Sequence, residues 1–293
     1  RGELGEEGSQ VGMAQQAAAG RHAGPFKKPF KQYEQPWHMS KFQPVKAHIA
    51  ALDPELLSGL STKDTDVPGY LSKVSAALEE GMDDIFGVRA LEEDRRKMTK
   101  IPAKLFDDFE PGGGASVILI AALQYRKRGG LDFGVFESVF VKDRKMGRQH
   151  VVLFLEIEKA LLNAGLLVRP KVFIGADLPK QEKNTLKDIV VAHHGQIASS
   201  RGHATHEIVP DSQAEEAEGE FCRSLETQDR MAKVHWWYYP DSYHEWTPTS
   251  KISGAAEPPM VTPKLWKVYA RFVRDLDKFN EWMNEEDYLD EEG

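Results

Sequence analysis

Beyond the first 37 residues, apolar residues recur at helical spacing as far as residue 165. One helical face is formed by side chains at intervals of three and four: Tyr70, Leu71, Val74, Leu78, Met82, Ile85 and Phe86. Cap and turn residues over 62–68 precede this face and predict the start of a helix. A short helix over 103–109 and a longer one over 151–163 follow, and Gly165 can end the second in a left-handed conformation.

A glycine-rich segment, 111–116, precedes an apolar stretch over 117–125. It lacks the Gly-Lys-Ser/Thr ending that binds phosphate and magnesium, so we interpret the glycines as the start of the next helix. The longest purely apolar run in the chain has 7 residues, 117–123, whereas a bilayer needs about 20. The sequence therefore predicts no membrane-spanning helix.

The hydrophobic period shortens after residue 165. Segments 166–168 and 172–174 both have an extended pattern, and helices that end in such a pair favour a winged-helix arrangement with a short β wing. Segment 172–174 also opens a β-α-β-β pattern. In that pattern Asp177 is the expected N-cap and Pro179 lies near the first helical position. The helix has one apolar face and ends near Gly195.

Two short strands, near 196–198 and 207–209, complete this pattern. An acidic low-complexity stretch, 211–220, then interrupts it and is expected to be a linker.

Composition adds limits to this organisation. The chain has 293 residues, enough for about one to three domains. The net charge of −8 is concentrated in residues 281–293, which hold seven acidic and no basic residues and resemble a solvated tail. Overall charge neither demands nor excludes a nucleic-acid partner. The single cysteine, Cys222, cannot form an internal disulfide and points to a reducing compartment.

The N-terminal end has features that are not typical of a folded domain. Residues 1–24 contain six glycines and a Gln-Gln-Ala-Ala-Ala stretch, so we expect a disordered leader. Because the first residue is Arg1 rather than methionine, we also expect the chain to be a piece of a longer protein.

No catalytic pattern emerges from the sequence. There is no phosphate loop, nucleophile elbow or coherent acid pair, so we expect no enzymatic activity and no cofactor. Four histidines are clustered but fit no standard zinc spacing, so we expect no metal site there: His193, His194, His203 and His206.

Basic residues gather at two places where they could contact a DNA backbone. They are Arg126, Lys127 and Arg128, and then Lys142, Arg144, Lys145 and Arg148. The alternative is that they are solvated loops opposite acidic neighbours. An aromatic and basic segment, 25–37, leaves a similar choice between contact with nucleic acid and a strand of chain pinned across a domain by its aromatic rings.

The densest aromatic run is 234–248, Val-His-Trp-Trp-Tyr-Tyr-Pro-Asp-Ser-Tyr-His-Glu-Trp-Thr-Pro. It resembles the chromodomain sequence in which a strand ends in Val-x-Trp and continues to a later Trp-x-Pro. That resemblance implies a candidate aromatic cage for a cationic side chain, formed by Phe221, Trp236 and Tyr239. The same rings could instead form core, and the prolines at 258, 259 and 263 disfavour the helix that usually closes a chromodomain.

Further segments resemble domains of chromatin proteins. Thr205-His206 resembles the strand entry of BRCT domains, although Gly175-Ala176-Asp177 lacks the Ser/Thr-Gly pair of phosphopeptide-binding members. With segments 101–104, 168–170, 186–189 and above all 280–288, the chain resembles the SMARCC, or Moira-type, scaffold subunits of SWI/SNF chromatin-remodelling complexes.

The family resemblance implies an α+β fold with a MarR-like winged-helix region followed by a split BRCT domain with a chromodomain-like β insertion. The expected boundaries are 1–24 for the leader, 25–170 for the winged-helix region, 171–215 and 256–288 for the two BRCT halves, 216–255 for the insertion and 289–293 for an acidic tail.

The function implied by the resemblance is that of a nuclear, non-enzymatic scaffold that binds other SWI/SNF subunits and acts in transcriptional regulation. The alternative function is direct reading of histone tails or DNA through the chromodomain-like or winged-helix module. No membrane partner is expected.

Overall fold

The computed structural model describes residues 33, 35–61, 65–88, 90–129, 151–211, 221–237, 243–252, 256–257 and 260–290. These residues fall into two compact units: one lies between 213 and 262, and the other combines 29–212 with 263–293. Helices and strands both contribute, so the expected α+β class is confirmed. The predicted leader and the second basic cluster, 142–148, lie outside the described residues. No helix of the described part is long and apolar enough to span a bilayer.

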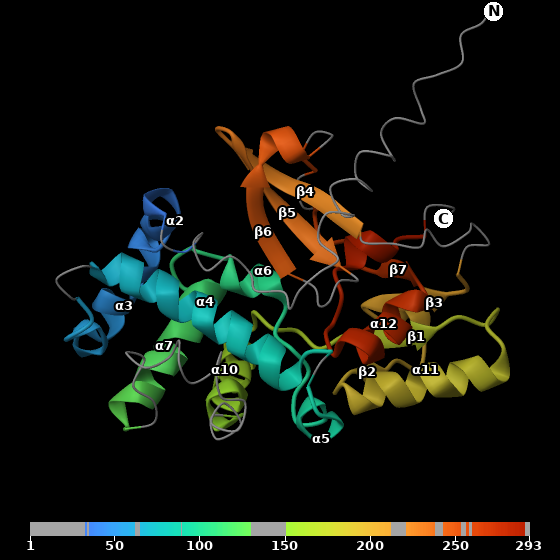
Figure 1. Ribbon diagram of the computed structural model, residues 1–293. Coiled ribbons are helices and arrows are strands. Elements are labelled where there is room, and N and C mark those ends of the chain that lie inside the picture. Colours follow the sequence, from blue (N-terminus) through green and yellow to red (C-terminus); the bar gives the residue numbers. More distant parts are fainter. Residues whose placement is uncertain are drawn as a thin grey trace, which may run out of the picture. The chain divides into compact units, whose positions relative to one another are not determined.

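The larger unit opens with a group of helices (Figure 1). They are α2 (Pro36–Ser40), α3 (Gln43–Leu52), the 3-10 helix η2 (Pro54–Leu57), α4 (Val67–Phe86), α5 (Glu92–Arg95), α6 (Ala103–Phe106), α7 (Gly114–Lys127) and α10 (Val151–Asn163). The Asp66 side chain caps α4 by accepting a hydrogen bond from the Gly69 N–H at 2.9 Å. The predicted helix start within 62–68 is therefore confirmed.

The glycines before α7 allow close packing. A Cβ on Gly114 would lie 2.2 Å from the Leu105 carbonyl oxygen, so the end of α6 can approach α7 only with glycine at this position. The Asp108 carboxylate accepts the Gly114 N–H at 2.8 Å and satisfies one of the free donors at the helix start. The interpretation of the glycine-rich segment as a helix start is correct.

One apolar cluster holds the helices together. It includes Leu71, Leu78 and Phe86 from α4, together with buried residues of α3, α7 and α10. Phe86 and Phe154 meet edge to face with ring centroids 5.7 Å apart. The helical face predicted from the sequence is thus the face that α4 buries.

Helix α10 ends where its sequence indicated, because Gly165 adopts a left-handed φ of +71°. The wing expected next is not at 166–174. Residues 166–168 form no strand, and β1 (Lys171–Ile174) belongs to a parallel sheet instead. Its backbone groups pair with strands later in the chain, so this part of the winged-helix prediction is wrong.

The parallel sheet has the strand order β2-β1-β3-β7. Its remaining strands are β2 (Gln196–Ile197), β3 (His206–Val209) and β7 (Trp266–Tyr269), with the 3-10 helix η4 (Arg201–His203) before β3. β3 pairs with β7 in parallel, with Ile208 opposite Val268. Strands from before and after the other compact unit therefore share one sheet.

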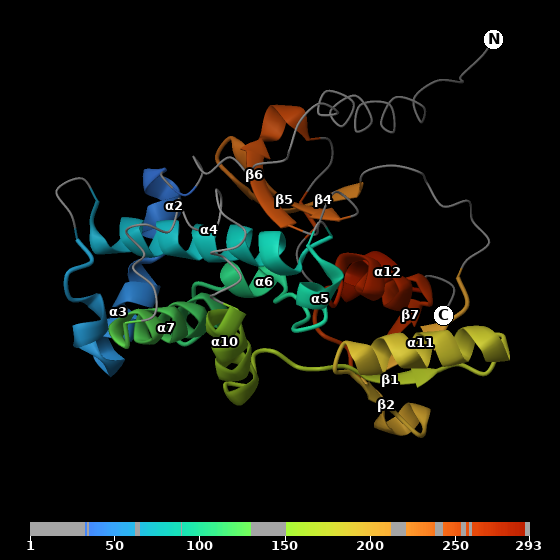
Figure 2. The ribbon, with the colours of Figure 1, turned by 60° about the horizontal axis from the view of Figure 1, so that its bottom comes forward.

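Two helices, α11 (Lys180–Ala192) and α12 (Arg271–Phe279), are in contact with each other (Figure 2). Leu186 and Val190 form the buried side of α11. The N-cap of α11 is Pro179 rather than the expected Asp177, because the helix begins later than the sequence suggested. Phe272, Val273 and Leu276 are buried on α12, and Trp282 lies beyond the end of this helix.

The smaller unit contains an antiparallel sheet in the order β4-β5-β6. Its strands are β4 (Phe221–Gln228), β5 (Met231–Trp237) and β6 (Tyr243–Pro248), followed by the 3-10 helix η5 (Thr249–Lys251). Asp229 takes a left-handed φ of 54° in the tight turn between β4 and β5. Among the described residues, its buried apolar cluster consists of Ala232, Val234 and Trp236. Residues 256–257 and 260–265 form no helix.

Candidate functional site

Trp236 is the candidate cage residue whose side-chain surroundings the structure describes. Trp236 is 5% exposed and packs with Ala232 and Val234 in the core of the small sheet. The strand register pairs Trp236 with Cys222 and pairs Phe221 with Trp237. Tyr239 lies outside the described residues. Because recognition of a cation needs accessible ring faces, Trp236 offers little binding surface in this conformation.

The first basic cluster stands opposite acidic side chains. The Lys127 ammonium lies 2.8 Å from Glu55 and 3.5 Å from Asp53, and the hydrogen bond that it donates to Glu55 is the main reason that the pKa of Lys127 is raised. Arg128 pairs with Glu156 on α10. These exposed pairs fit the interpretation of this cluster as a solvated surface with acidic neighbours.

The aromatic segment near residue 33 is pinned to α4 where the structure describes it. The Tyr33 hydroxyl donates to Glu79 at 2.9 Å, and the Ser72 hydroxyl donates to the Tyr33 carbonyl oxygen at 2.9 Å. Burial, followed by the Glu79 charge, raises the pKa of Tyr33 well above its ordinary value. Tyr33 therefore acts as an anchor; residues 26–31 lie outside the described part.

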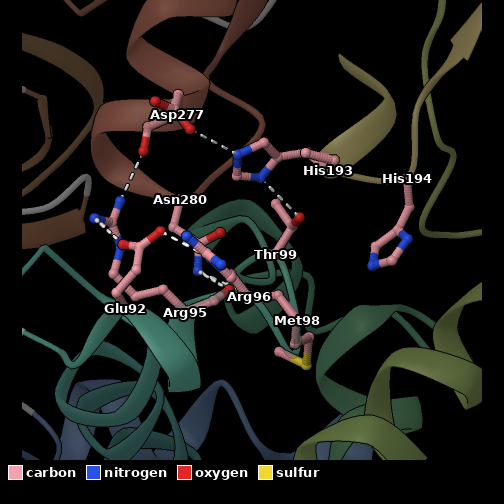
Figure 3. Close-up of a pocket in the computed structure, with 10 residues that line it drawn as sticks. Glu92, Arg95, Arg96, Met98, Thr99, His193, His194, Asp277 and Asn280 are labelled. Carbon is pink, nitrogen blue, oxygen red and sulfur yellow. Dashed lines mark hydrogen bonds and ion pairs between the residues drawn. The ribbon is translucent and has the colours of Figure 1, made fainter. Parts of the chain in front are cut away.

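A pocket of about 460 Å³ opens where the loop after α5 meets the ends of α11 and α12 (Figure 3). Its lining is polar and carries both charges: Glu92, Arg95, Arg96, Met98, Thr99, Ala192, His193, His194, Asp277 and Asn280. The size would suit a small ligand. Most of its polar groups, however, are already bonded to one another.

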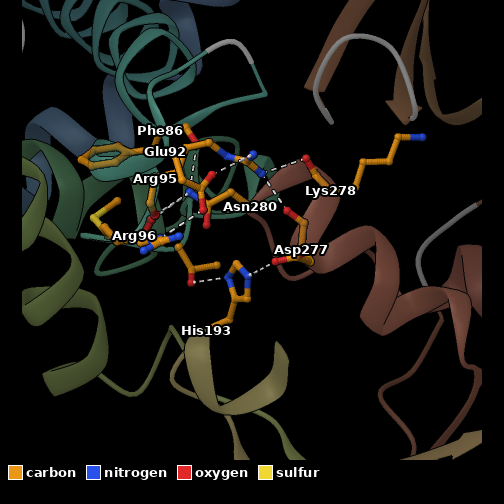
Figure 4. A network of polar contacts seen from close by, with 10 residues as sticks. Phe86, Glu92, Arg95, Arg96, His193, Asp277, Lys278 and Asn280 are labelled. Carbon is orange, nitrogen blue, oxygen red and sulfur yellow. Dashed lines mark hydrogen bonds and ion pairs between the residues drawn. The ribbon is translucent and has the colours of Figure 1, made fainter. Parts of the chain in front are cut away.

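Arg95 caps the end of α12 (Figure 4). Its guanidinium donates to the carbonyl oxygens of Asp277 at 2.7 Å and Lys278 at 2.9 Å. The last carbonyls of a helix lack partners within the helix and carry partial negative charge, so a cation there is stabilising.

Asn280 joins the same junction from the other side. It takes a left-handed conformation, φ 54°, at the C-cap of α12, a conformation that asparagine tolerates better than most residues. Its side-chain amide donates to the carbonyl oxygens of Phe86, Arg95 and Met98 at 2.9, 3.1 and 2.9 Å. One buried amide therefore satisfies acceptors on a loop more than 180 residues earlier in the chain.

His193 adds a titratable contact at the end of α11. One ring nitrogen lies 3.1 Å from the Thr99 hydroxyl and the other 3.5 Å from Asp277. Burial lowers the pKa of His193, although the Asp277 carboxylate acts in the opposite direction. The neutral ring is thus favoured at this junction.

A buried lysine completes the junction. The side chain of Lys100 is 1% exposed, and its ammonium lies 2.8 Å from Asp83 and 3.2 Å from Glu281. The Lys100 N–H also donates to the Asn280 carbonyl oxygen at 2.8 Å. Removing one member of such a set would leave a buried charge without its partner, which is strongly destabilising.

Residues after Asn280 contact residues of the part of the larger unit that contains the parallel sheet. A Cβ on Gly195 would lie 2.8 Å from the Trp282 ring, so glycine is what permits this contact. The Tyr288 hydroxyl donates to Asp275 at 2.9 Å, and its ring meets Phe272 edge to face. The expectation of a solvated acidic end is therefore wrong for Glu281 and Glu285, whose carboxylates are enclosed by cationic partners.

Glu285 shows the electrostatic effect of this enclosure. Burial on its own raises its pKa, but the hydrogen bond from His206 and the charge of Lys104 outweigh it and lower the pKa to about 2. The four clustered histidines thus lie at separate places: His206 pairs with Glu285, His193 and His194 line the pocket, and the His203 ring contacts Ser200. The described residues contain no group of three or more metal-ligating side chains.

The sequence indicates only one part of this junction. Segment 280–288 resembles one family, but Lys100 and Arg95 belong to no motif that predicts their contacts. Their contacts hold the helical and parallel-sheet parts together. The arrangement has the chemistry of a structural interlock, with charges and hydrogen bonds used internally.

Comparison with protein families bears on the first half of the chain. Residues 23–167 match a known family model. It is the SWIRM-associated domain at the N-terminal, and the match covers just under half of the chain. We call residues 23–167 the SWIRM-associated region. This similarity supports a subunit related to SWI/SNF chromatin-remodelling complexes that associates with other subunits, and a remodelling domain implies a nuclear protein.

Proposed function

We propose that this chain is a non-enzymatic scaffold subunit of a SWI/SNF-type ATP-dependent remodelling complex and acts in transcriptional regulation through protein–protein assembly. The observation that carries the proposal is the match of residues 23–167 to the SWIRM-associated domain. Arg95, Asn280 and Lys100 form their polar contacts within the chain. This internal pairing favours a rigid scaffold for other proteins rather than a catalytic site.

The finer modules belong to the same proposal. A parallel sheet with the order β2-β1-β3-β7, completed by a strand that follows a separate β unit, supports a split BRCT-like domain. The three-stranded antiparallel sheet supports a chromodomain-like insertion. We assign the helices of the SWIRM-associated region to a MarR-like domain on the family resemblance alone.

Affinity purification with mass spectrometry tests the scaffold. The tagged chain, expressed in nuclei, should capture other remodeller subunits, and the capture should persist at raised salt and after nuclease treatment. A variant with Lys100→Met, Glu281→Met and Asp83→Asn removes all three charges of the interlock at similar volume and probes its contribution. Capture that disappears with nuclease would favour the DNA reader and contradict the scaffold.

Direct reading of histone tails or DNA is the less supported function. Trp236 is largely buried, and Lys127 and Arg128 have acidic partners. Titration with trimethylated and unmodified histone peptides should give no methyl-dependent binding tighter than about 10 μM, or roughly −7 kcal/mol. Tighter methyl-dependent binding that Trp236→Ala abolishes without unfolding the sheet would favour the reader.

A further inference from the structure

Threonine followed by proline occurs twice in this sequence, at Thr247-Pro248 and Thr262-Pro263, and serine followed by proline does not occur. The two threonines differ in their exposure to solvent. Thr247 is 4% exposed in β6, where its backbone lies opposite Ala232. Thr262 is exposed in the connection before β7, beside Val261, which is 92% exposed.

The connection around Thr262 lacks regular secondary structure, as an accessible kinase substrate segment does. Residues 260–265 form neither helix nor strand, and the proline at 263 biases Thr262 toward extended backbone. Two further prolines, 258 and 259, precede it in the sequence. An exposed, extended chain can enter the cleft of another enzyme without unfolding the domains on either side.

The hydroxyl of Thr262 is also available. Among the described residues it makes no hydrogen bond, so its modification breaks no contact that stabilises the fold. Lys264, exposed two residues later, adds a positive charge that would interact favourably with a phosphate on Thr262.

From these observations we propose that Thr262 is a phosphorylation site for a proline-directed serine/threonine protein kinase. The Thr262 hydroxyl oxygen attacks the γ-phosphorus of a magnesium-bound nucleoside triphosphate. The bond from that phosphorus to the β,γ-bridging oxygen breaks, the nucleoside diphosphate leaves, and the hydroxyl proton passes to a carboxylate of the kinase. The product carries about −1.5 to −2 charges on an exposed connection.

The test uses the whole 293-residue chain with magnesium, ATP and, separately, a cyclin-dependent and a mitogen-activated protein kinase. We expect incorporation at Thr262, located by tandem mass spectrometry. Thr262→Val should abolish it, Thr262→Ser should retain it, and Pro263→Ala should slow it by at least about tenfold, because a proline-directed kinase reads this residue. Thr247→Val is the matched control and should change nothing.

A second measurement separates accessibility from sequence preference. A peptide of residues 243–252 should be phosphorylated at Thr247, because the protection of Thr247 in the whole chain comes from the β6 ladder. Phosphate on Thr247 of the folded chain would overturn the proposal. So would a peptide of residues 256–267 that is modified at Thr262 when the folded chain is not, or a whole chain that neither kinase modifies at Thr262.

Discussion

The two compact units differ in how much core they have. The larger unit packs helices α3, α4, α6, α7 and α10 around an apolar cluster that includes Phe42, Phe86 and Phe154. The small antiparallel sheet relies on Ala232, Val234 and Trp236, with Ile252 packed against them. A sheet with so few buried residues needs its aromatic side chains for stability, which leaves fewer of them for binding.

The second difference is the source of the long-range contacts. Strands β4 to β6 follow one another and pair with their neighbours in sequence, so the small sheet depends on local hairpins. The larger unit depends on residues after 262, which supply β7, α12 and Asn280. The fold of the larger unit therefore depends on the C-terminal residues of the chain. Mutations can probe the two units separately.

The largest effect is expected from removing residues 263–293. The deletion takes away β7 and α12, exposes the apolar face of the sheet, and should cost more than about 5 kcal/mol at ~25 cal/mol per Å² of apolar surface. Chemical denaturation followed by circular dichroism measures it. Removal of 291–293 alone is the control, and unchanged stability of the longer deletion would contradict the shared sheet.

Trp236→Ala should destabilise the small sheet by about 4 kcal/mol, because it empties much of a small core. Hydrogen exchange should show loss of protection in β4 to β6, while α4 and α10 keep theirs. Ile252→Ala, at the edge of the same cluster, should cost less. Loss of protection throughout the chain would mean that the two units are not independent in stability.

Asn280→Ala should cost the larger unit about 3 kcal/mol, because the carbonyl oxygens of Phe86, Arg95 and Met98 lose their donor. Asn280→Gly keeps the left-handed conformation without the amide and should recover only the part of the loss that is due to backbone strain. Thermal unfolding measures both variants. Equal stability of wild type and Asn280→Ala would show that the hydrogen bonds of the Asn280 side chain contribute nothing to the stability of the fold.

Acid should weaken the larger unit through Glu285. A carboxyl group whose pKa falls from 4.5 to about 2 on folding stabilises the protein above pH 4.5, and this contribution is lost as the pH falls toward 2. The loss should reach about 2 to 3 kcal/mol at 1.36 kcal/mol per pKa unit. Glu285→Gln should remove this part of the pH dependence, which denaturant titrations between pH 5 and 2.5 would measure. A variant with the same acid profile as wild type would refute the assignment.

The smallest effect is expected from charge reversal of Arg126, Lys127 and Arg128. If the chain binds DNA at all, the binding should be weak, and this change should reduce it with little dependence on DNA sequence. Fluorescence anisotropy at two salt concentrations measures this. Strong sequence-specific binding that the triple variant leaves intact would contradict a contribution from this cluster.

Sequence alone predicted those features that depend on neighbouring residues. Helix α10 has the predicted bounds, and α4 begins at a cap within the predicted segment, because apolar periodicity, an aspartate cap and a left-handed glycine act within a few residues of each other. The same local logic failed at 166–174. An extended pattern does not say which strand will be its partner, and β1 pairs with distant strands.

Only the tertiary structure decided the roles of Asn280, Lys100 and Arg95. Each has a partner about 180 residues away in sequence, and no periodicity or motif spacing connects such pairs. By composition, the acidic C-terminal segment resembles a solvated tail. The structure instead places the buried Lys100 beside Glu281. The two Thr-Pro pairs differ for the same reason: their sequences are alike, and it is β6 pairing that buries Thr247 while Thr262 stays exposed.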